Sequence, residues 1–305
     1  MENIFDPRAR SNHAMVFDQE HEATVMFGGF VPGSLYGPLQ RDTWKWNGER
    51  WEAVPFNGAP SIRLSMAMVY DTSRQVAVLF GGAYYTSPFG DTWEMKDWAW
   101  KQKATEGPAP RSDHAMAYDE ERRVTVLFGG KAPNKFYGDT WEWDGNFWTK
   151  KSETGPRARV GHAMAYDAIR KKTVLFGGSD QTGVYDGKTW EWDGSAWTQL
   201  AIDGPTPVIG HTMVFDRLHR NVMLFGGSNA MPYADVWLLG GAPCPADLDG
   251  DERVDASDFE IFLSAYETLE CVPPAVCASD FNGDGVVDDA DFSVFAAAYG
   301  EMVCP

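Results

Sequence analysis

The chain has 305 residues, of which 44% are hydrophobic and 14% aromatic, so it can bury a large core. Its net charge of -18 is opposite to the basic footprint that a nucleic-acid-binding protein needs against phosphates. No apolar run reaches the roughly 18 residues of a membrane-spanning helix, so no membrane span is predicted.

The N-terminal segment, MENIFDPRARSN, lacks the apolar stretch of a signal peptide. The cysteines near the other end nevertheless indicate an extracellular protein, as argued below. We therefore expect that the natural start precedes this chain, or that export uses another route.

Five repeats follow in chain order. The string FGG begins at Phe27, Phe80, Phe128, Phe176 and Phe225, in steps of 53, 48, 48 and 49 residues. Around it recur HAMAYD, then TVLFGG, then DTWEWD, then a segment led by Trp. Each segment is short, alternates in polarity and is rich in Val, Tyr, Phe and Trp, which predicts β-strands. Four antiparallel strands in a period of about 50 residues predict one blade of a β-propeller.

Glycines mark the predicted turns. The Gly-Gly pair ends the second strand of each repeat, where the backbone needs torsions that residues with a Cβ resist. Asn47-Gly48, Asp144-Gly145 and Asp193-Gly194 lie between the third and fourth strands and are hairpin signals. The tryptophans of the first four repeats are expected to fill the spaces between blades.

The double glycine and the paired tryptophans at fixed offsets resemble the kelch family over residues 1–241. The resemblance implies an all-β, five-bladed kelch propeller and leaves the activity open, because kelch propellers serve as enzymes, ligand binders and docking scaffolds. The fifth repeat stops one strand short, after DVWLL. We expect Glu2–Phe5 to complete the last blade; a longer natural protein is the alternative.

The kelch resemblance places the turn before each first strand around one mouth of the central channel. Arginines in these turns would bind carboxylates or sulfates there, or would pair with the aspartates of neighbouring DTW segments. Aromatic residues in the loops between second and third strands suit sugars or peptides, and would alternatively pack over the blades. The candidate ligand-binding residues are Arg10, Arg63, Arg111, Arg159, Tyr36, Tyr84, Tyr85, Tyr137 and Tyr185.

A histidine also recurs before the first strand, at His13, His114, His162 and His211, with Met66 in the second repeat. Its regularity favours a structural hydrogen bond, with metal binding as the alternative. No catalytic residues are predicted. The propeller region has no cysteine for a copper site like that of galactose oxidase, and no histidine has an aspartate four residues earlier, as the iron motif of nitrile-specifier kelch proteins requires.

The C-terminal segment is strongly acidic. Residues 244–305 hold fifteen Asp and Glu and one Arg, a net charge of -14, which leaves -4 for the rest of the chain. DLDGDERVDASD (247–258) and DFNGDGVVDDAD (280–291) carry side-chain oxygens at positions 1, 3, 5, 9 and 12, the ligand spacing of an EF-hand calcium loop with a backbone carbonyl at position 7. We therefore expect two Ca²⁺ ions. Their predicted ligands are Asp247, Asp249, Asp251, Arg253, Asp255, Asp258, Asp280, Asn282, Asp284, Val286, Asp288 and Asp291.

One apolar helix is predicted after each loop. This duplicated loop-and-helix pattern resembles a type I dockerin and defines a second domain, residues 242–305, after a first domain of residues 1–241. The resemblance implies docking to a cohesin-type scaffold or cell-surface protein. The residues that it assigns to that contact are Ala256, Ser257, Asp289 and Ala290.

All four cysteines lie in this tail and predict two disulfides in an oxidising, extracellular setting. Three pairings are possible. A helix of about 18 Å would separate Cys244 from Cys271, so pairs Cys244–Cys304 and Cys271–Cys277 suit two antiparallel helices.

The sequence thus favours a secreted, non-catalytic adaptor whose propeller loops recognise a glycan or a protein and whose tail docks to a cohesin-type partner. Two alternatives stay open. The chain could be a carbohydrate-active enzyme of a cellulosome-like complex, or its tail could be a calcium-stabilised end cap without a cohesin partner.

Overall fold

The computed structural model describes residues 7–33, 39–55, 58–202, 204–217, 220–229, 231–240, 248, 256–268, 279 and 286–301. The chain divides into two compact units, which are Met1–Phe215 with Val222–Leu238 and Asp216–Asn221 with Leu239–Pro305. Each unit is described by itself.

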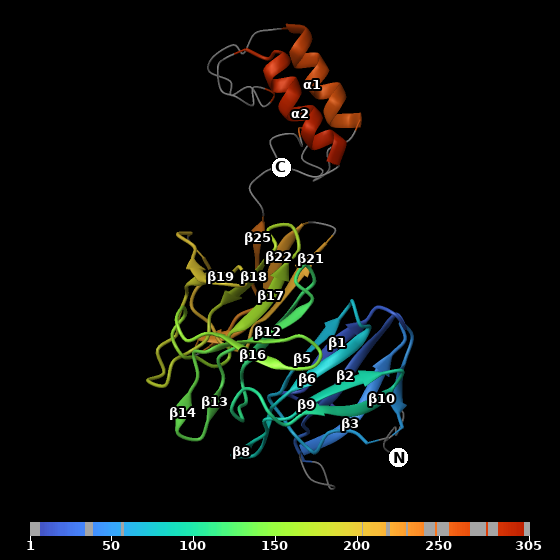
Figure 1. Ribbon diagram of the computed structural model, residues 1–305, viewed down its shortest axis with the longest axis vertical. Helices are drawn as coiled ribbons and strands as arrows, with labels where there is room; N and C mark the ends of the chain where they lie inside the picture. The colour runs from blue at the N-terminus through green and yellow to red at the C-terminus, as the bar shows by residue number, and fades with distance from the viewer. Residues whose placement is uncertain are drawn as a thin grey trace. The chain divides into compact units, whose positions relative to one another are not determined.

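The larger unit is a five-bladed β-propeller (Figure 1). Four of its sheets have four strands, the fifth has three among the described residues, and the strands of each sheet follow one another in sequence order. The predicted fold of this unit is therefore confirmed at the level of a β-propeller with five blades.

The first three blades each have four strands. Blade 1 consists of β1 (Ala14–Asp18), β2 (Ala23–Phe30), β3 (Leu39–Trp46) and β4 (Trp51–Val54). Blade 2 consists of β5 (Ala67–Asp71), β6 (Val76–Phe80), β9 (Thr92–Lys96) and β10 (Ala99–Ala104). Blade 3 consists of β11 (Ala115–Asp119), β12 (Val124–Phe128), β15 (Thr140–Trp143) and β16 (Trp148–Ser152).

The last two blades complete the unit. Blade 4 consists of β17 (Ala163–Asp167), β18 (Lys172–Phe176), β19 (Thr189–Trp192) and β20 (Trp197–Gln199). Blade 5 consists of β21 (Thr212–Asp216), β22 (Asn221–Phe225) and β25 (Val236–Gly240). Short hairpins extend blades 2, 3 and 5: β7 (Ala83–Tyr84) with β8 (Ser87–Pro88), β13 (Lys131–Ala132) with β14 (Lys135–Phe136), and β23 (Ser228–Asn229) with β24 (Met231–Pro232).

The first strands β1, β5, β11 and β17 contact one another in succession and so line the inside of the ring. In blades 2 to 4 the second strands are almost completely buried, because a neighbouring blade covers each face. All five side chains of β6, VAVLF, are buried. This strand is therefore apolar on both faces and does not show the alternation of polar and apolar residues that was expected.

The predicted turns between third and fourth strands are confirmed in blades 1, 3 and 4. In blade 3 the amide of Asp144 donates to the carbonyl of Phe147, and the Asp144 side chain accepts from the amides of Asn146 and Phe147 at 2.8 Å each. Gly145 has φ +97°, which residues with a Cβ rarely adopt.

The glycine pairs bring neighbouring blades together. The amide of Gly130 donates to the carbonyl of Arg159 in the next blade at 2.9 Å, and a Cβ on Gly130 would meet backbone of its own blade at 2.8 Å. The pair follows the second strand as predicted in blades 2 to 5, but β2 of blade 1 continues through it with a register shift between Phe27 and Gly29.

A phenylalanine beside the glycine pair packs at a steep angle against a tryptophan of the next blade. The ring pairs are Phe27–Trp100, Phe80–Trp148 and Phe128–Trp197, with centroids 5.2–5.3 Å apart. The equivalent Phe225 of blade 5 is 50% exposed. Glu2–Phe5, the segment predicted to complete this blade, lies outside the described residues.

The smaller unit contains two helices, α1 (Ala256–Thr268) and α2 (Asp289–Glu301). Their contact is aromatic: Phe262 stacks on Phe295 with centroids 5.0 Å apart, and both side chains are buried. Neither described helix has the length and apolar character needed to cross a bilayer.

Candidate functional site

The arginines predicted to bind ligand lie inside the blades. In blade 3, Arg111 donates from both terminal nitrogens to Asp139 at 2.7 and 3.1 Å, and from Nη1 to the carbonyl of Gly129 at 2.9 Å. Trp141 donates its indole N–H to the same Asp139 at 2.7 Å. Blades 1 and 2 repeat the group as Arg10–Asp42–Trp44 and Arg63–Asp91–Trp93.

Burial and charge act in opposite directions on this aspartate. Burial alone would raise the pKa of Asp139, but the hydrogen bonds and positive charge of Arg111 outweigh it and hold the pKa below its usual value. Arg63, Arg111 and Arg159 are at most 1% exposed. The pairing of Arg with the DTW aspartate, weighed above as the structural alternative, is what the described residues show, and the ligand role of these arginines stays a prediction.

Aromatic rings cover two of these arginines. The ring of Phe89 lies 4.2 Å from the Arg63 guanidinium carbon, and the ring of Tyr137 lies 3.9 Å from that of Arg111. Tyr137 is consequently buried rather than presented on a loop.

The other predicted binding aromatics are distributed differently. Tyr84 and Tyr85 on the β7–β8 hairpin are exposed and touch edge to face, with centroids 4.9 Å apart. Tyr185 is half-buried and lines a cavity in blade 4. Tyr36 lies outside the described residues. The structure therefore does not gather these predicted residues into one cluster.

The repeated histidines link successive blades. His162 and His211 lie 3.1 and 3.2 Å from the carbonyl oxygens of Phe128 and Phe176 in the preceding blades. Because a carbonyl only accepts, Nε2 carries the proton in each ring. Burial lowers the pKa of His211 to about 4 and that of His114 to about 3. His114 and His211 are therefore neutral near pH 7, and the donor role is seen for His162 and His211.

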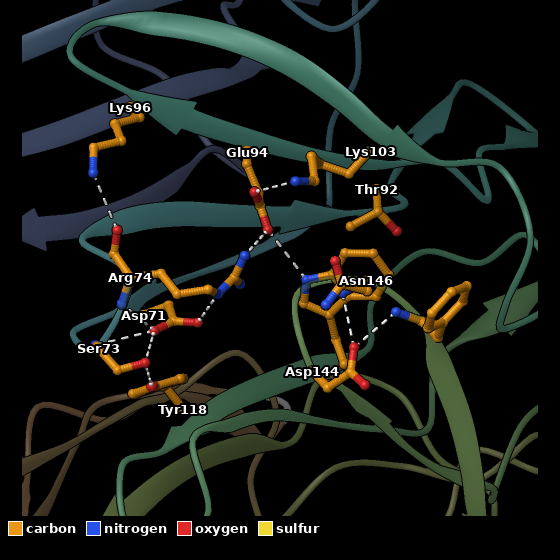
Figure 2. A network of polar contacts seen from close by, with 12 residues as sticks. Asp71, Ser73, Arg74, Thr92, Glu94, Lys96, Lys103, Tyr118, Asp144 and Asn146 are labelled. Carbon is orange, nitrogen blue, oxygen red and sulfur yellow. Dashed lines mark hydrogen bonds and ion pairs between the residues drawn. The ribbon is translucent and has the colours of Figure 1, made fainter.

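A second network of charged residues recurs in blades 2 to 4, and Figure 2 shows the copy in blade 2. Arg74 bridges Asp71 and Glu94 within blade 2, and Tyr118 of blade 3 donates to Ser73 at 2.8 Å. The same Asp–Arg–Glu bridge recurs as Asp119–Arg122–Glu142 and Asp167–Arg170–Glu191. Blade 1 departs from it.

In blade 1, His21 and Lys45 replace the arginine and the glutamate, and the turn of blade 2 that covers them has Asp97-Trp98 where blade 3 has Gly145-Asn146. The Trp98 ring lies 4.7 Å from that of His21 and 4.6 Å from Lys45 Nζ. Glu20, His21 and Asp97 place ligand atoms within 4.8 Å of one another, the one such group in the part of the chain that the structure describes. Sequence reasoning missed this cluster; the change from Arg to His21 was the available signal.

Blade 4 also departs from the repeat, at the edge of the blade opposite to the one where β17 ends and β18 begins. A cavity of about 850 Å³ opens where β17 and β19 begin and β18 and β20 end. It is lined by residues of the segments 155–159, 180–190 and 199–202.

In the smaller unit, the structure describes the last ligand position of each predicted calcium loop. Asp258 and Asp291 lie in the first turns of α1 and α2 and are 0% exposed. Asp258 accepts from the amide of Leu248 at 2.6 Å, and Asp291 from the amide of Asp288 at 3.0 Å. Val286 and Asp288 lie just before α2.

The remaining residues predicted for this unit divide into two groups. Ala256, Ser257, Asp289 and Ala290 are all exposed at the starts of the helices, and Tyr266 donates to Asp289 at 2.6 Å. Outside the described residues lie Asp247, Asp249, Asp251, Arg253, Asp255, Asp280, Asn282, Asp284, Cys244, Cys271, Cys277 and Cys304.

No protein-family model matches the sequence, and comparison with curated proteins gives no significant match. Among solved structures, the chain is similar to one described as "Structure of YjhT", with a TM-score of 0.64 and 14% sequence identity. The match covers 76% of this chain and 82% of that one. At this identity the likeness supports the β-propeller fold alone.

Proposed function

We propose that the protein is an extracellular, non-catalytic adaptor of kelch and dockerin type. Its propeller binds a glycan or protein ligand, and its C-terminal unit, loaded with two Ca²⁺ ions, docks to a cohesin-type partner. Asp258 and Asp291 carry the proposal for the C-terminal unit.

These two carboxylates are fully buried at equivalent positions, in a unit whose described residues also bury Phe262, Val287 and Phe295. A buried carboxylate is costly unless a cation or several donors compensate its charge. Calcium, a hard cation with six to eight oxygen ligands, is such a cation and would act together with the amide donors that each carboxylate has. Asp258, Asp288 and Asp291, with the carbonyl of Val286, are the described residues that would hold it.

The two helices present matching apolar side chains. Phe259, Ile261 and Leu263 on α1 are 36–41% exposed, and Phe292 and Val294 at the equivalent places on α2 are 40–42% exposed. Together with the exposed Ala256, Ser257, Asp289 and Ala290, they are side chains that a partner protein could bury. Their exposure supports docking over an end cap, which would need no exposed apolar residues.

Capture of the full chain on immobilised cohesin modules tests the proposal. We expect capture with calcium and loss of capture with a chelator, because ion binding orders the loops before both helices. The double variant Asp258→Asn, Asp291→Asn should lose capture. Glu260→Gln removes an exposed charge from α1 without touching a predicted ligand and should retain it. Calcium uptake without capture by any cohesin would favour the end cap.

A further inference from the structure

Blade 4 breaks the repeat at the edge where its cavity opens. The segment Asp186-Gly187-Lys188 occupies the place of Tyr137-Gly138-Asp139 in blade 3. The backbone confirms the alignment, because the amides of Asp186 and Tyr137 donate to the equivalent carbonyls of Gly178 and Gly130 at 2.9 and 2.8 Å. Blade 4 therefore has an aspartate where blade 3 has a covering ring, and a lysine where blade 3 has the aspartate.

This exchange changes the environment of the buried arginine. Asp186 reaches Arg159 through one contact, Nη2 to Oδ2 at 2.7 Å, whereas Arg111 makes two contacts with Asp139. The described residues place no aromatic ring over Arg159 like that of Tyr137 over Arg111. Arg159 and Asp186 both line the cavity.

The exchange also leaves a hydrogen-bond donor without an acceptor. In blades 1 to 3 the indole N–H of the first tryptophan donates to the aspartate two residues earlier. In blade 4 that position is Lys188, and the buried Nε1 of Trp190 has no partner among the described residues. Buried donors in native proteins are nearly always satisfied, so a missing partner needs an explanation.

The other groups around the cavity also favour an anionic acceptor. Arg157 and Lys188 line it and make no ion pair within the described part of the chain. The two lining carboxylates are already engaged, Asp186 by Arg159 and Asp180 by the amide and hydroxyl of Thr182 at 2.8 and 2.6 Å. Trp190 Nε1 and the positive charges of Lys188 and Arg157 are therefore the groups of the cavity that favour an anion.

We propose that this cavity binds a small ligand through a carboxylate group, which accepts from Trp190 Nε1 and is attracted by Lys188 and Arg157. The volume of about 850 Å³ falls within the range of small-molecule sites. Tyr185 lines the cavity and offers an apolar face to the remainder of the ligand. The inference rests on the part of the proposed function that gives ligand recognition to the propeller and is independent of the calcium-binding tail.

Calorimetric titration of the full chain tests this site with two sources of carboxylate, glucuronate and N-acetylglutamate. Glucose and N-acetylglutamine are their uncharged counterparts. We expect saturable binding of at least one acid and none of its counterpart, and the acid that binds identifies the source. No saturation by either acid below about 10 mM, or equal binding of acid and counterpart, would overturn the proposal.

Three variants place the binding on the cavity. Lys188→Asp restores the aspartate of the other blades, which would accept from Trp190 and repel the ligand, so affinity should fall by about tenfold or more. Trp190→Phe keeps a ring and removes the donor, and should weaken binding. Trp141→Phe, the same change in blade 3, should leave affinity unchanged. Unaltered binding by Lys188→Asp would overturn the assignment. Both blade 4 variants should still be captured through the tail, which separates failure of this site from failure of the docking proposal.

Discussion

At the scale of single residues, the guanidinium groups of Arg63, Arg111 and Arg159 are almost completely buried, and each pairs with an aspartate. Removal of one partner leaves the other charge buried without compensation, which costs about 3–5 kcal/mol. We expect Asp139→Ala to lower the free energy of unfolding by that amount, because Arg111 and the Trp141 N–H both lose their acceptor. Urea unfolding followed by fluorescence measures it.

Glu153→Ala is the control for this substitution. Glu153 pairs with Lys150 at 2.7 Å, but its side chain is 72% exposed. Water screens such a pair, so its loss should cost less than about 1 kcal/mol. Equal effects of the two substitutions would show that the Arg111–Asp139 pair does not stabilise the blade.

The buried histidines make stability depend on pH. Burial lowers the pKa of His114 to about 3. In the unfolded chain this imidazole is protonated below about pH 6.5, whereas in the folded chain it stays neutral there. Stability is therefore unaffected above pH 6.5 and falls as the pH drops from there toward the folded-state pKa. His114→Met, which copies Met66, should reduce the loss of unfolding free energy between pH 7 and pH 5 by about 2 kcal/mol. An unchanged loss would mean that His114 does not titrate on unfolding.

At the scale of elements, the sequence predicted strands and turns well because both depend on local chemistry. Alternating β-branched and aromatic residues specify the strands, and Asp-Gly or Asn-Gly pairs specify the turns of blades 1, 3 and 4. The rest depends on contacts between blades. The burial of β6 on both faces and the ring of Tyr137 over Arg111 arise only when blades meet, so the sequence pattern did not predict them.

The blade 4 cavity is a second feature that the sequence pattern did not predict. Its signal was present in the sequence, as Asp186-Gly187-Lys188-Thr189-Trp190 in place of Gly-Asp-Thr-Trp. In the sequence, the aspartate merely lies three residues before Thr189 instead of one. Its effect is visible only in the structure, where Asp186 still pairs with Arg159 but Trp190 Nε1 has no acceptor. Tyr185 and Arg159 were predicted as binding residues, but Lys188, Arg157 and Trp190 were missed. Trp190 recurs in every repeat and Arg157 has a counterpart in Arg8, so only Lys188 was distinctive.

The turns between third and fourth strands also hold neighbouring blades together. Gly145 and Gly48 have nearly the same φ, +97° and +94°, so alanine at either site costs about 1–2 kcal/mol of backbone strain. A Cβ at position 145 would lie 2.7 Å from the Arg74 guanidinium of blade 2, whereas one at position 48 would meet nothing within 4 Å. We expect Gly145→Ala to lower the denaturation midpoint more than Gly48→Ala. Equal midpoints would show that Arg74 moves without cost.

At the scale of the whole molecule, the two units differ in what stabilises them. The propeller buries aromatic and aliphatic side chains between successive sheets, and apolar burial of this size sustains a fold without a metal. The described core of the smaller unit consists of a few side chains around Phe262 and Phe295. A unit of that size needs further stabilisation, which the predicted ions and disulfides would supply.

Calorimetry of the full chain should therefore show two transitions, and calcium should raise only one. An ion present at a hundred times its dissociation constant stabilises the state that binds it by about 2.7 kcal/mol per site. Every tryptophan of the chain lies at or before Trp237, so tryptophan fluorescence reports the unfolding of the propeller alone. We expect the fluorescence midpoint to be the same with calcium and with a chelator, while one calorimetric peak moves. If calcium shifts the fluorescence midpoint as well, the two units unfold together; if neither signal moves, the C-terminal loops do not bind the ion.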